Sequence, residues 1–511
     1  MMFEKDYGEG IVAVLPLHKE AKQTGKACEE LAKKYQQKYR SYDIVVENCF
    51  LKLKIKDFAK ALQSTELSSF SITHPYKTIV DFSSPNIGKP FHVGHLRSTI
   101  LGESLSRMLE RLGGKVIRWN YLGDWGIQYG KLIEAYKKWG NPQELEKKGL
   151  KYLFELYVKA HEENLTGEEE FKKLEQGDKE NLALWKKFKE ISLQEYQKIY
   201  ELLDIKFDVW KGESHYYQTA GEVVKEALKK GIAYEDKDGS IVIPLKDKNL
   251  PNLVISKRGE RTLYATRDLA CLKERCKLAE HCYYVVGSEQ KTYFEQIFTA
   301  SKLLEYCTSN HLEHISFGLL TLPQGKFSTR KGNVIFVEDL LETIKNKVKQ
   351  TLEAKSIRAK DEDIMKVTVS TLSYSLLSQA RRKDFIFDLE KFVSFEGNTA
   401  IYLLYTYRRA KKIVEGAKYQ NPETIKHPIS KSIIVMLHRY PFYLKKAYDN
   451  KDPYYLALYA YELSKLYNKL YQQQKFIGTE YEQEGIAITF NILEKLEEIF
   501  YILNLKVPQI M

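Results

Sequence analysis

The pattern that most restricts the fold lies between residues 77 and 122, where a strand, a helix and a second strand follow one another closely. The β-branched run KTIVDF predicts a short strand, and HLRSTILGESLSRMLERLGG places its apolar side chains at helical spacing before a Gly-Gly stop. The segment KVIRWNYLG then predicts the next strand. Two strands joined by one crossover helix are parallel. We therefore predict a parallel α/β sheet, which binds its ligand at the carboxyl ends of the strands.

The rest of the chain divides into segments around this pattern. Residues 1–78 predict a small α+β module, because a helical stretch precedes a strand, a turn and a strand. Residues 79–364 carry the α/β pattern with a charged, helix-rich insertion at about 135–255, and residues 365–511 are amphipathic and helical. The predicted fold class is multidomain α/β: a Rossmann-type parallel-sheet domain with an inserted helix-rich region, a small N-terminal module and a C-terminal all-α helical bundle.

Composition restricts the location of the protein and its class of partner. Lys and Arg number 80 against 68 Asp and Glu, and the net charge of +12 suits a polyanionic partner such as RNA. The six cysteines form no C-x-x-C pair and no zinc spacing, which predicts free thiols in a reducing compartment and no metal site. We find no signal peptide and no apolar run of about 18 residues, so we expect a cytoplasmic protein without a membrane segment.

The stretch NIGKPFHVGH follows the first predicted strand and opens the helix. His92 and His95 share one face of the first turn, where helix N-termini attract phosphate, and both imidazoles could donate hydrogen bonds to it. Gly94 between them has no side chain, so a flat ring could lie against the backbone. The alternative is an exposed histidine pair at a helix start, because H-x-x-H is common by chance.

A second, basic stretch, LPQGKFSTRKGNVIFVEDLL, supports the phosphate interpretation. Glycines bracket its polar residues, and a mobile basic loop of this kind can close over phosphates and neutralise a leaving pyrophosphate. Alone, such a charge run is more often a solvated surface. The candidate residues of this loop are Lys326, Ser328, Arg330 and Lys331.

Together these stretches resemble one family. SSPNIGKPFHVGHLRST resembles the HIGH signature of class I aminoacyl-tRNA synthetases, and KFSTRKGNV resembles their KMSKS motif in the form that arginyl-tRNA synthetases have. NYLGDWGIQYG, LYATRDLA and EGNTAIYLLYTY are also similar to that family. The resemblance implies that ATP and L-arginine form arginyl-adenylate and pyrophosphate, and that arginine then passes to tRNA(Arg). It also implies a monomer, and Mg²⁺ that arrives with ATP rather than in a dedicated protein site.

The resemblance further implies which residues contact ATP. The two histidines would stabilise the triphosphate, beside Gly94, Lys326 and Lys331. One position departs from the family motif, because Thr329 stands where KMSKS has its second lysine. Lys89, just before the first motif, is the candidate replacement, and Lys331 is its competitor.

An arginine substrate needs carboxylates for its guanidinium and an aromatic or hydroxyl neighbour. Tyr264 and Asp268, one helical turn apart in YATRD, fit that need, although read alone they are an ordinary i, i+4 pair. The resemblance implies that Asp81, otherwise an ordinary strand-end residue, is a second carboxylate. It implies that Ser84, Asn86 and Gln290 hold the amino and carboxylate groups of arginine, and that His95 also contacts the arginine.

The C-terminal helices resemble the family's anticodon-binding domain, in which aromatic faces stack on unpaired bases and basic residues contact phosphates. The candidate tRNA-binding residues are Tyr402, Tyr405, Arg409 and Met511. Without the resemblance, a Tyr/Leu stripe at helical spacing is more typical of a core. Residues 1–78 resemble a shortened form of the domain that contacts the tRNA corner.

Two other functions stay open at this point. Another class I synthetase or nucleotidyltransferase could use the same phosphate corner, but the carboxylates Asp81 and Asp268 suit a cationic substrate. A catalytically silent tRNA-binding paralogue is the second alternative. Intact His92, His95 and Lys326 argue against it, because a chain without catalysis would tolerate their loss.

Overall fold

The computed structural model describes residues 10–39, 42–63, 73–258, 263–321 and 336–510. Contacts between residues divide the chain into two compact units. The sheet unit comprises residues 74–343 and 379–388. The helical unit comprises residues 1–73, 344–378 and 389–511.

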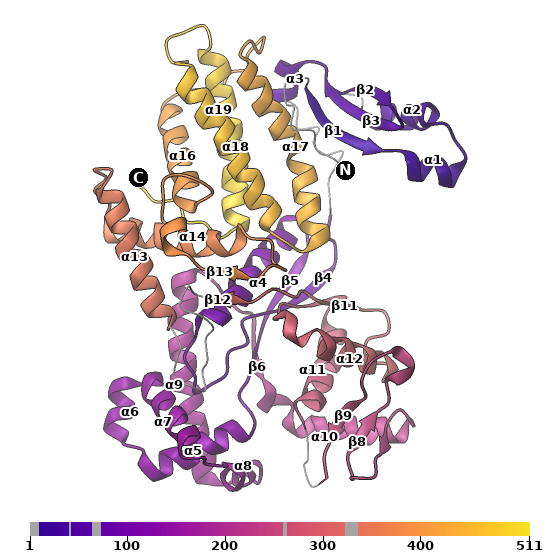
Figure 1. The fold of residues 1–511 in the computed structure, drawn as a ribbon, viewed down its shortest axis with the longest axis vertical. Helices are drawn as coiled ribbons and strands as arrows, with labels where there is room; N and C mark the ends of the chain where they lie inside the picture. Colours follow the sequence, from indigo (N-terminus) through magenta and orange to yellow (C-terminus); the bar gives the residue numbers. More distant parts are fainter. Residues whose placement is uncertain (1–9, 40–41, 64–72, 259–262, 322–335, 511) are drawn as a thin grey trace. The chain divides into compact units, whose positions relative to one another are not determined.

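The sheet unit is built on five parallel strands in the order β11-β10-β4-β5-β6 (Figure 1). Strand β4 (Lys77–Asp81) leads through helix α4 (Val93–Arg111) into the neighbouring β5 (Lys115–Leu122), which confirms the predicted strand–helix–strand pattern. The strand order reverses between β4 and β10 (His281–Tyr284), and at such a point the carboxyl ends of the strands open a crevice. Strand β11 (His311–His314) forms one edge of the sheet.

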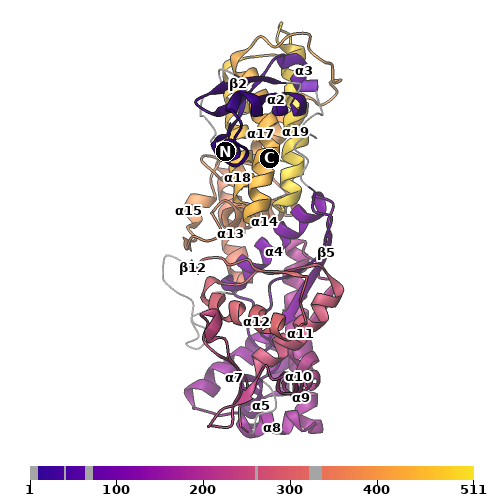
Figure 2. The same cartoon turned by 90° about the vertical axis from the view of Figure 1, so that its right-hand side faces the viewer.

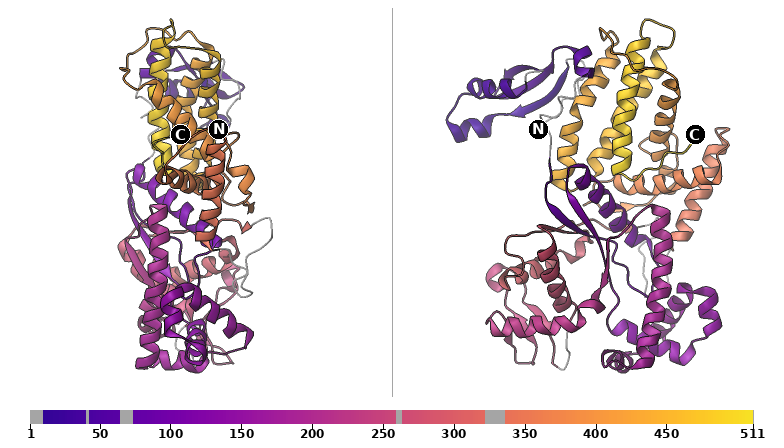
Figure 3. Two further views of the ribbon diagram at one scale, coloured as in Figure 1. Left: turned by 90° about the vertical axis from the view of Figure 1, so that its left-hand side faces the viewer. Right: turned by 180° about the vertical axis from the view of Figure 1, so that it is seen from behind.

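Strand β6 (Val209–Gly212) differs from the prediction for residues 135–255. The sequence predicts a helix-rich insertion there, but β6 pairs with β5 and completes the main sheet. Its residues, VWKG, are mostly half-buried and include a lysine, so they lack the apolar run that marks a buried strand. Figures 1 and 3 show the surrounding helices in two groups, α5–α9 and α10–α12. Their bounds are α5 (Ile127–Trp139), α6 (Pro142–Lys148), α7 (Leu150–Glu162), α8 (Glu168–Glu175), α9 (Lys179–Leu203), α10 (Glu213–Lys229), α11 (Tyr264–Leu278) and α12 (Lys291–Leu303).

Two small sheets complete the sheet unit. One is antiparallel, in the order β7-β8-β9, and the other is a parallel pair, β12 with β13. The buried Arg97 of α4 donates to the carbonyl oxygens of Gly318 (2.6 Å) and Lys383 (2.8 Å), and so fastens this strand pair to the first helix of the unit. The bounds are β7 (Tyr234–Glu235), β8 (Ile241–Ile243), β9 (Leu253–Ser256), β12 (Leu320–Thr321) and β13 (Phe385–Ile386).

The N-terminal module forms an antiparallel sheet in the order β1-β3-β2, with the predicted strand–turn–strand pair. Although the sequence separates it from the C-terminal helices, it packs on helix α17 within the helical unit. Buried Arg439 of α17 donates to the carbonyl oxygens of Ile11 (2.7 Å) and Val12 (3.2 Å), and this contact holds β1 against the helix. The elements of the module are β1 (Ile11–Pro16), α1 (His18–Thr24), α2 (Cys28–Lys38), β2 (Tyr42–Glu47), β3 (Phe50–Ile55) and α3 (Phe58–Gln63).

The rest of the helical unit is the predicted all-α bundle, in which α17, α18 and α19 lie side by side (Figures 1 and 2). Tyr459, Leu463 and Tyr467 of α18 are fully buried, so much of its tyrosine stripe is core. Across the described ranges, no helix is both long and apolar enough to cross a membrane. The helices are α14 (Asp361–Leu377), α15 (Leu389–Phe392), α16 (Ala400–Ile413), α17 (Pro428–Asn450), α18 (Tyr454–Gln473) and α19 (Glu482–Ile502), together with the part of α13 (Val337–Glu353) from residue 344 on.

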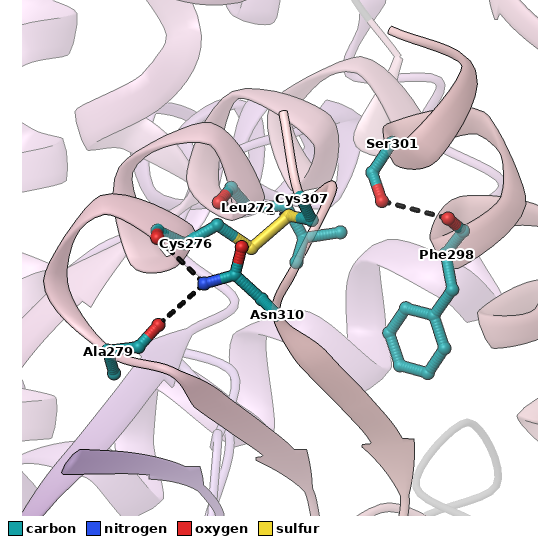
Figure 4. The surroundings of a disulfide bond; sticks show 7 residues. All are labelled: Leu272, Cys276, Ala279, Phe298, Ser301, Cys307 and Asn310. Atoms are coloured by element: carbon teal, nitrogen blue, oxygen red, sulfur yellow. Dashed lines mark hydrogen bonds between the residues drawn. A yellow bond between two sulfur atoms is a disulfide. The ribbon is translucent and has the colours of Figure 1, made fainter. Parts of the chain in front are cut away.

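Four of the six cysteines are paired, so the prediction of free thiols is wrong for them. Cys28 is bonded to Cys49 in the N-terminal module, and Cys276 on α11 is bonded to Cys307 after α12 (Figure 4). Cys271 is a buried free thiol, as is Cys282. The two disulfides span 21 and 31 residues, and no spacing motif marks them in the sequence.

Candidate active site

A cleft opens where the strand order reverses, on the carboxyl side of the main sheet. Its volume is about 430 Å³, and its walls come from the segment after β4, the start of α4, and the segments around η3 (Ser288–Gln290) and β12. The structure therefore joins two distant parts of the chain at one site. Six residues predicted from the sequence line this cleft: Ser84, Asn86, His92, Gly94, His95 and Gln290.

The segment after β4 turns sharply as it enters the cleft. Ser83 and Ser84 have φ angles of 74° and 48°, in the left-handed region that residues with a side chain rarely adopt. Hydrogen bonds fix this turn, because the N–H of Ser83 donates to Ser98 Oγ (3.0 Å) and the N–H of Ser84 donates to Asn120 Oδ1 (3.2 Å). Strained backbone that its surroundings hold in place is typical of functional sites.

The two histidines of the first motif cap helix α4. Nδ1 of His92 accepts a hydrogen bond from the N–H of Gly94 (3.1 Å), and the N–H of His92 donates to Nδ1 of His95 (3.3 Å). The rings stack with their centroids 3.9 Å apart. A Cβ on Gly94 would lie 2.8 Å from the His92 ring, so the flat group packed against this glycine is the protein's own imidazole. Because both Nδ1 atoms accept, each neutral ring carries its proton on Nε2, which can donate to a ligand.

The electrostatics of the histidine pair favour the neutral form. Burial lowers the pKa of His92 to about 4, and the charge of Lys89 adds to the effect. Burial also lowers the pKa of His95 well below its ordinary value, with smaller effects from His92 and Lys89. Both side chains are half-buried, so the alternative of an exposed pair does not hold. The pair offers two neutral donors at physiological pH.

Lys89 lies close enough to the histidines to lower their pKa values, but it does not line the cleft. Its Nζ donates to Gln128 Oε1 (3.1 Å) and stands 4.5 Å from the ring centroid of Tyr157. Its predicted competitor and the rest of the basic loop, Lys326, Ser328, Arg330 and Lys331, lie outside the described residues. The replacement of the missing KMSKS lysine by Lys89 therefore stays a prediction, with Lys331 as the alternative.

The residues predicted to bind a guanidinium lie on helix α11. Tyr264, the first residue of this helix, is 55% exposed, and its ring centroid lies 5.0 Å from that of Tyr293. Asp268, one turn further on, accepts a hydrogen bond from the Tyr293 hydroxyl. Burial raises the pKa of Asp268, because the desolvated carboxylate is disfavoured.

The structure adds a carboxylate that the sequence analysis does not single out. Glu213 is the first residue of α10 and directly follows β6, so it lies at the carboxyl edge of the sheet. Its Oε2 accepts from Nε (2.8 Å) and Nη2 (2.7 Å) of Arg267. Burial raises the pKa of Glu213 to about 7; Arg267 opposes this rise, and the negative charge of Asp268 adds to it. No apolar run marks β6 as a strand in the sequence. For that reason the sequence does not show that Glu213, the residue after β6, lies at the edge of the sheet.

Asp81, predicted to be a second carboxylate for the substrate guanidinium, lies beside a guanidinium of the protein. Its Oδ2 already accepts a hydrogen bond from Nη1 of Arg275 at 2.9 Å, and the residue is only 5% exposed. A guanidinium of the protein therefore contacts one oxygen of this carboxylate, and the contact of Asp81 with the substrate stays a prediction. The sequence places the two residues 194 positions apart, so their pairing is visible only in the fold.

The helical unit contains a larger groove, of about 1190 Å³, along α16 and α19. Of the predicted tRNA-binding residues, Tyr405 and Arg409 line it, and the Arg409 guanidinium lies 4.7 Å from the ring centroids of both Tyr405 and Tyr471. Tyr402 does not line the groove, because its ring faces that of Tyr461 at 5.7 Å. Met511 lies outside the described residues. The groove also carries further cationic side chains: Arg408, Lys411 and Lys412.

The family models assign this chain, with its parallel sheet, its histidine-capped helix after β4 and its separate all-α domain, to the class I tRNA synthetases. Residues 57–389 match the family described as tRNA synthetases class I (R), catalytic domain. Residues 403–511 match the DALR anticodon binding domain. The two matches together cover most of the chain.

Relatives narrow the class further. The arginine–tRNA ligase of Clostridium perfringens is 39% identical over 443 residues, which cover 83% of this chain and 78% of that protein. Arginine–tRNA ligase 1 of Bacillus thuringiensis subsp. konkukian is 35% identical over 447 residues, or 84% and 79% of the two chains. The chain belongs to the arginine–tRNA ligase family, which confirms the resemblance drawn from its motifs.

Solved structures share the fold. The arginyl-tRNA synthetase of Thermus thermophilus superimposes with a TM-score of 0.82 at 19% identity, covering 98% of this chain and 94% of that one. The arginyl-tRNA synthetase of Plasmodium falciparum gives a TM-score of 0.79 at 22% identity, covering 96% and 90%. The predicted fold class is confirmed.

Proposed function

We propose that this protein is an arginine–tRNA ligase that acts in protein synthesis. It joins L-arginine to ATP, forming arginyl-adenylate and pyrophosphate, and then transfers arginine to its cognate tRNA with release of AMP. In this reaction the chain positions the two substrates and stabilises charge, with no covalent intermediate on the protein.

The observation that carries the substrate assignment is the charge balance of the buried and half-buried groups near α11. Three carboxylates, Asp81, Glu213 and Asp268, are accompanied by two guanidinium groups, those of Arg267 and Arg275. Among the residues of this cluster that the structure describes, carboxylates therefore outnumber guanidinium groups by one, and the excess negative charge is costly in a poorly solvated environment until a further cation binds. A substrate guanidinium supplies that cation and can bind carboxylates through two hydrogen bonds.

The arginine would therefore lie with its guanidinium at Asp268 and Glu213, beside the Tyr264 ring. Burial raises the pKa of both Asp268 and Glu213, and the negative charge of Asp268 repels that of Glu213. A cation shared between them would therefore stabilise both ionised carboxylates. Ser84, Asn86 and Gln290 line the cleft, which Asp268 and Glu213 do not line, and there they would hold the amino and carboxylate groups of the substrate.

At the other end of the cleft, His92 and His95 would donate their Nε2 protons to the phosphates of ATP. The negative charge on the phosphates grows as the arginine carboxylate attacks the α-phosphorus and pyrophosphate departs, so fixed donors stabilise the transition state more than the ground state. Mg²⁺ would arrive bound to ATP. Lys89 and the loop residues Lys326, Ser328, Arg330 and Lys331 complete the proposed phosphate site.

The groove of the helical unit would bind unpaired bases of the tRNA. Tyr405 and Tyr471 flank Arg409, and such mixed aromatic and cationic surfaces hold single-stranded RNA. We further propose that the protein works as a monomer in the cytoplasm, where its tRNA substrate is used. We base this location on the reaction. The argument from free thiols no longer applies, because four of the six cysteines are paired.

Charging of tRNA tests the proposal. The purified protein, incubated with labelled L-arginine, ATP, Mg²⁺ and total tRNA, should produce acid-stable label on tRNA that alkali releases. Attachment of a different amino acid would contradict the assignment of arginine. Binding of tRNA with no aminoacylation would instead identify a silent tRNA-binding paralogue.

A further inference from the structure

One wall of the groove in the helical unit comes from the opposite end of the chain. Most residues that line the groove lie on α16 and α19, but Leu62 and Gln63 belong to α3, the last helix of the N-terminal module. Helix α3 contacts both α17 and α19 (Figures 1 and 2). The sequence predicts separate tRNA contacts for the module and the bundle, whereas the structure brings part of the module to the groove of the bundle.

His438 of α17 holds α3 in place. The ring is buried, and its Nε2 donates to the carbonyl oxygen of Ala61 (2.9 Å), directly before Leu62 and Gln63. This carbonyl lies in the last turn of α3, where carbonyl groups lack a helical partner. Burial lowers the pKa of His438, so the ring is neutral and its Nδ1 accepts from the Tyr42 hydroxyl of β2 (2.5 Å). One side chain of the bundle therefore fixes two elements of the module.

The side chains of the groove differ in how they can interact with a base. Rings such as those of Tyr405 and Tyr471 can stack on any base, and a cation such as Lys412 can contact a phosphate, which every nucleotide has. An amide carries a donor and an acceptor, and together they match the edge of one base better than the edges of the others. Recognition of base identity therefore needs a polar side chain of this kind.

Three side-chain amides line the groove, those of Gln63, Asn491 and Gln509. Nδ2 of Asn491 donates to the Ala487 carbonyl oxygen of its own helix (2.9 Å). Within the described residues the amide of Gln63 makes no hydrogen bond, and this residue is exposed. Gln63 thus combines a donor and an acceptor that can reach a ligand with a backbone that His438 holds in place. Gln509, in the C-terminal tail, is the alternative.

We propose that the N-terminal module takes part in reading the unpaired bases of the anticodon loop: the Gln63 amide hydrogen-bonds to the edge of one base in the groove, and His438 is a positioning residue that keeps α3 there. This inference rests on the proposed function, because the bases belong to the tRNA that the enzyme charges. It makes the module and the bundle one recognition surface rather than two separate ones.

Arginylation of tRNA(Arg) transcripts with single base replacements in the anticodon loop tests this proposal. Discrimination is the ratio of kcat/KM for the unreplaced and the replaced transcript. In Gln63→Ala, discrimination at one loop position should fall about tenfold, as expected when an amide no longer pairs with a base edge. Discrimination at the other positions, and the KM values of arginine and ATP, should stay unchanged.

Two further variants are matched controls. Gln23→Ala removes the same kind of side chain from α1 of the module, outside the groove, and should leave discrimination unchanged at every position. Lys412→Ala removes a cation from the groove. It should raise the KM of all transcripts by a similar factor, because a phosphate contact does not depend on the base.

His438→Ala tests the positioning role. It leaves the side chains of the groove in place but removes the donor to Ala61, so it should reproduce the selective loss seen in Gln63→Ala. Adding Gln63→Ala to it should cause no further loss at that position, because residues that act as one unit show non-additive effects. Additive losses would overturn the role of His438.

Gln63→Ala decides the proposal even if His438→Ala fails to fold, because it changes only an exposed side chain. An equal loss with every transcript in Gln63→Ala, or no loss with any, would overturn the proposal. Loss of discrimination in Gln509→Ala alone would also overturn it and would assign the reading of that base to the C-terminal tail. A wild-type protein that arginylates none of the transcripts would instead overturn the proposed function.

Discussion

The two ends of the candidate site use burial in opposite ways. At the start of α4, burial lowers the pKa of His92 and His95 and leaves them neutral, yet a neutral imidazole is still a complete hydrogen-bond donor. Near α11, burial raises the pKa of Glu213 and Asp268, and a buried carboxylate is costly until a cation reaches it. The phosphate end is therefore ready before the substrate binds, whereas the arginine end is completed by the substrate.

The largest effect is expected when one carboxylate is removed from the arginine end of the site. Asp268→Asn keeps the shape of the side chain but loses the charge, so the KM of arginine should rise about 100-fold, as when one partner of a buried charge pair is lost. The KM of ATP and the affinity for tRNA should not change, because the histidine end and the groove are intact. Steady-state arginylation measures all three. An unchanged KM of arginine would place the guanidinium elsewhere.

The next effect belongs to the phosphate end. His95→Ala removes one preorganised donor, and the rate of adenylate formation should fall about 100-fold. Arginine affinity should fall much less, since the side chains proposed to hold the guanidinium, Asp268 and Glu213, are unchanged. Single-turnover formation of adenylate separates the rate from binding. A variant with nearly wild-type rate would show that the histidine cap serves only the helix.

The third prediction uses pH to separate the two ends. Glu213 has a raised pKa of about 7, so it is partly protonated at neutral pH and must release a proton to bind a guanidinium. Arginine affinity should therefore increase about tenfold between about pH 6 and pH 8, with proton release on binding. The rate at saturating arginine should show no titration of His92 in this range, because its pKa is about 4.

Two substitutions on α10 test whether Glu213 causes this pH dependence of arginine affinity. Glu213→Gln should flatten the pH dependence of the arginine KM. Glu226→Gln, on the same helix, should leave it unchanged, because hydrogen bonds from Lys273, Tyr306 and Lys230 outweigh burial and lower the pKa of Glu226 to about 2. A profile that persists in Glu213→Gln would assign the titration to another group.

The smallest effect is expected from a substitution in the groove of the helical unit, which belongs to neither end of the candidate active site. Tyr405→Ala in the groove of the helical unit should raise the KM of tRNA about fivefold, the loss of one stacked base, without changing the KM of arginine. Tyr402→Ala, one turn earlier on α16 but outside the groove, is the control and should leave the KM of tRNA unchanged. Equal effects of the two substitutions would indicate a packing role for both.

The phosphate end was accessible to sequence analysis because its residues are close together in the chain. The strand ending at Asp81, the histidine pair and the helix that follows are contiguous, and the period of the apolar residues fixes the order strand–helix–strand. The sequence predicts Tyr264 and Asp268 as a pair for the same reason, since both lie within one helical turn.

The missed features depend on contacts between distant segments. Glu213 follows a four-residue strand that carries no apolar run, and Arg275 reaches Asp81 across 194 residues. The pairing of Cys276 with Cys307 depends on how α11 and α12 pack, and the contact of Arg439 with β1 joins opposite ends of the chain. No local pattern encodes such pairs, because the side chains meet only after the sheet and the bundle have formed.

ATP–pyrophosphate exchange with each of the twenty amino acids, in the presence of tRNA, tests the central claim most directly. It measures adenylate formation itself, and of the twenty amino acids only arginine offers a guanidinium to the carboxylates of Asp268 and Glu213. We predict exchange with arginine alone, lost in Asp268→Asn. Exchange with a different amino acid, or none with any of the twenty, would contradict the assignment of this cluster to an arginine guanidinium.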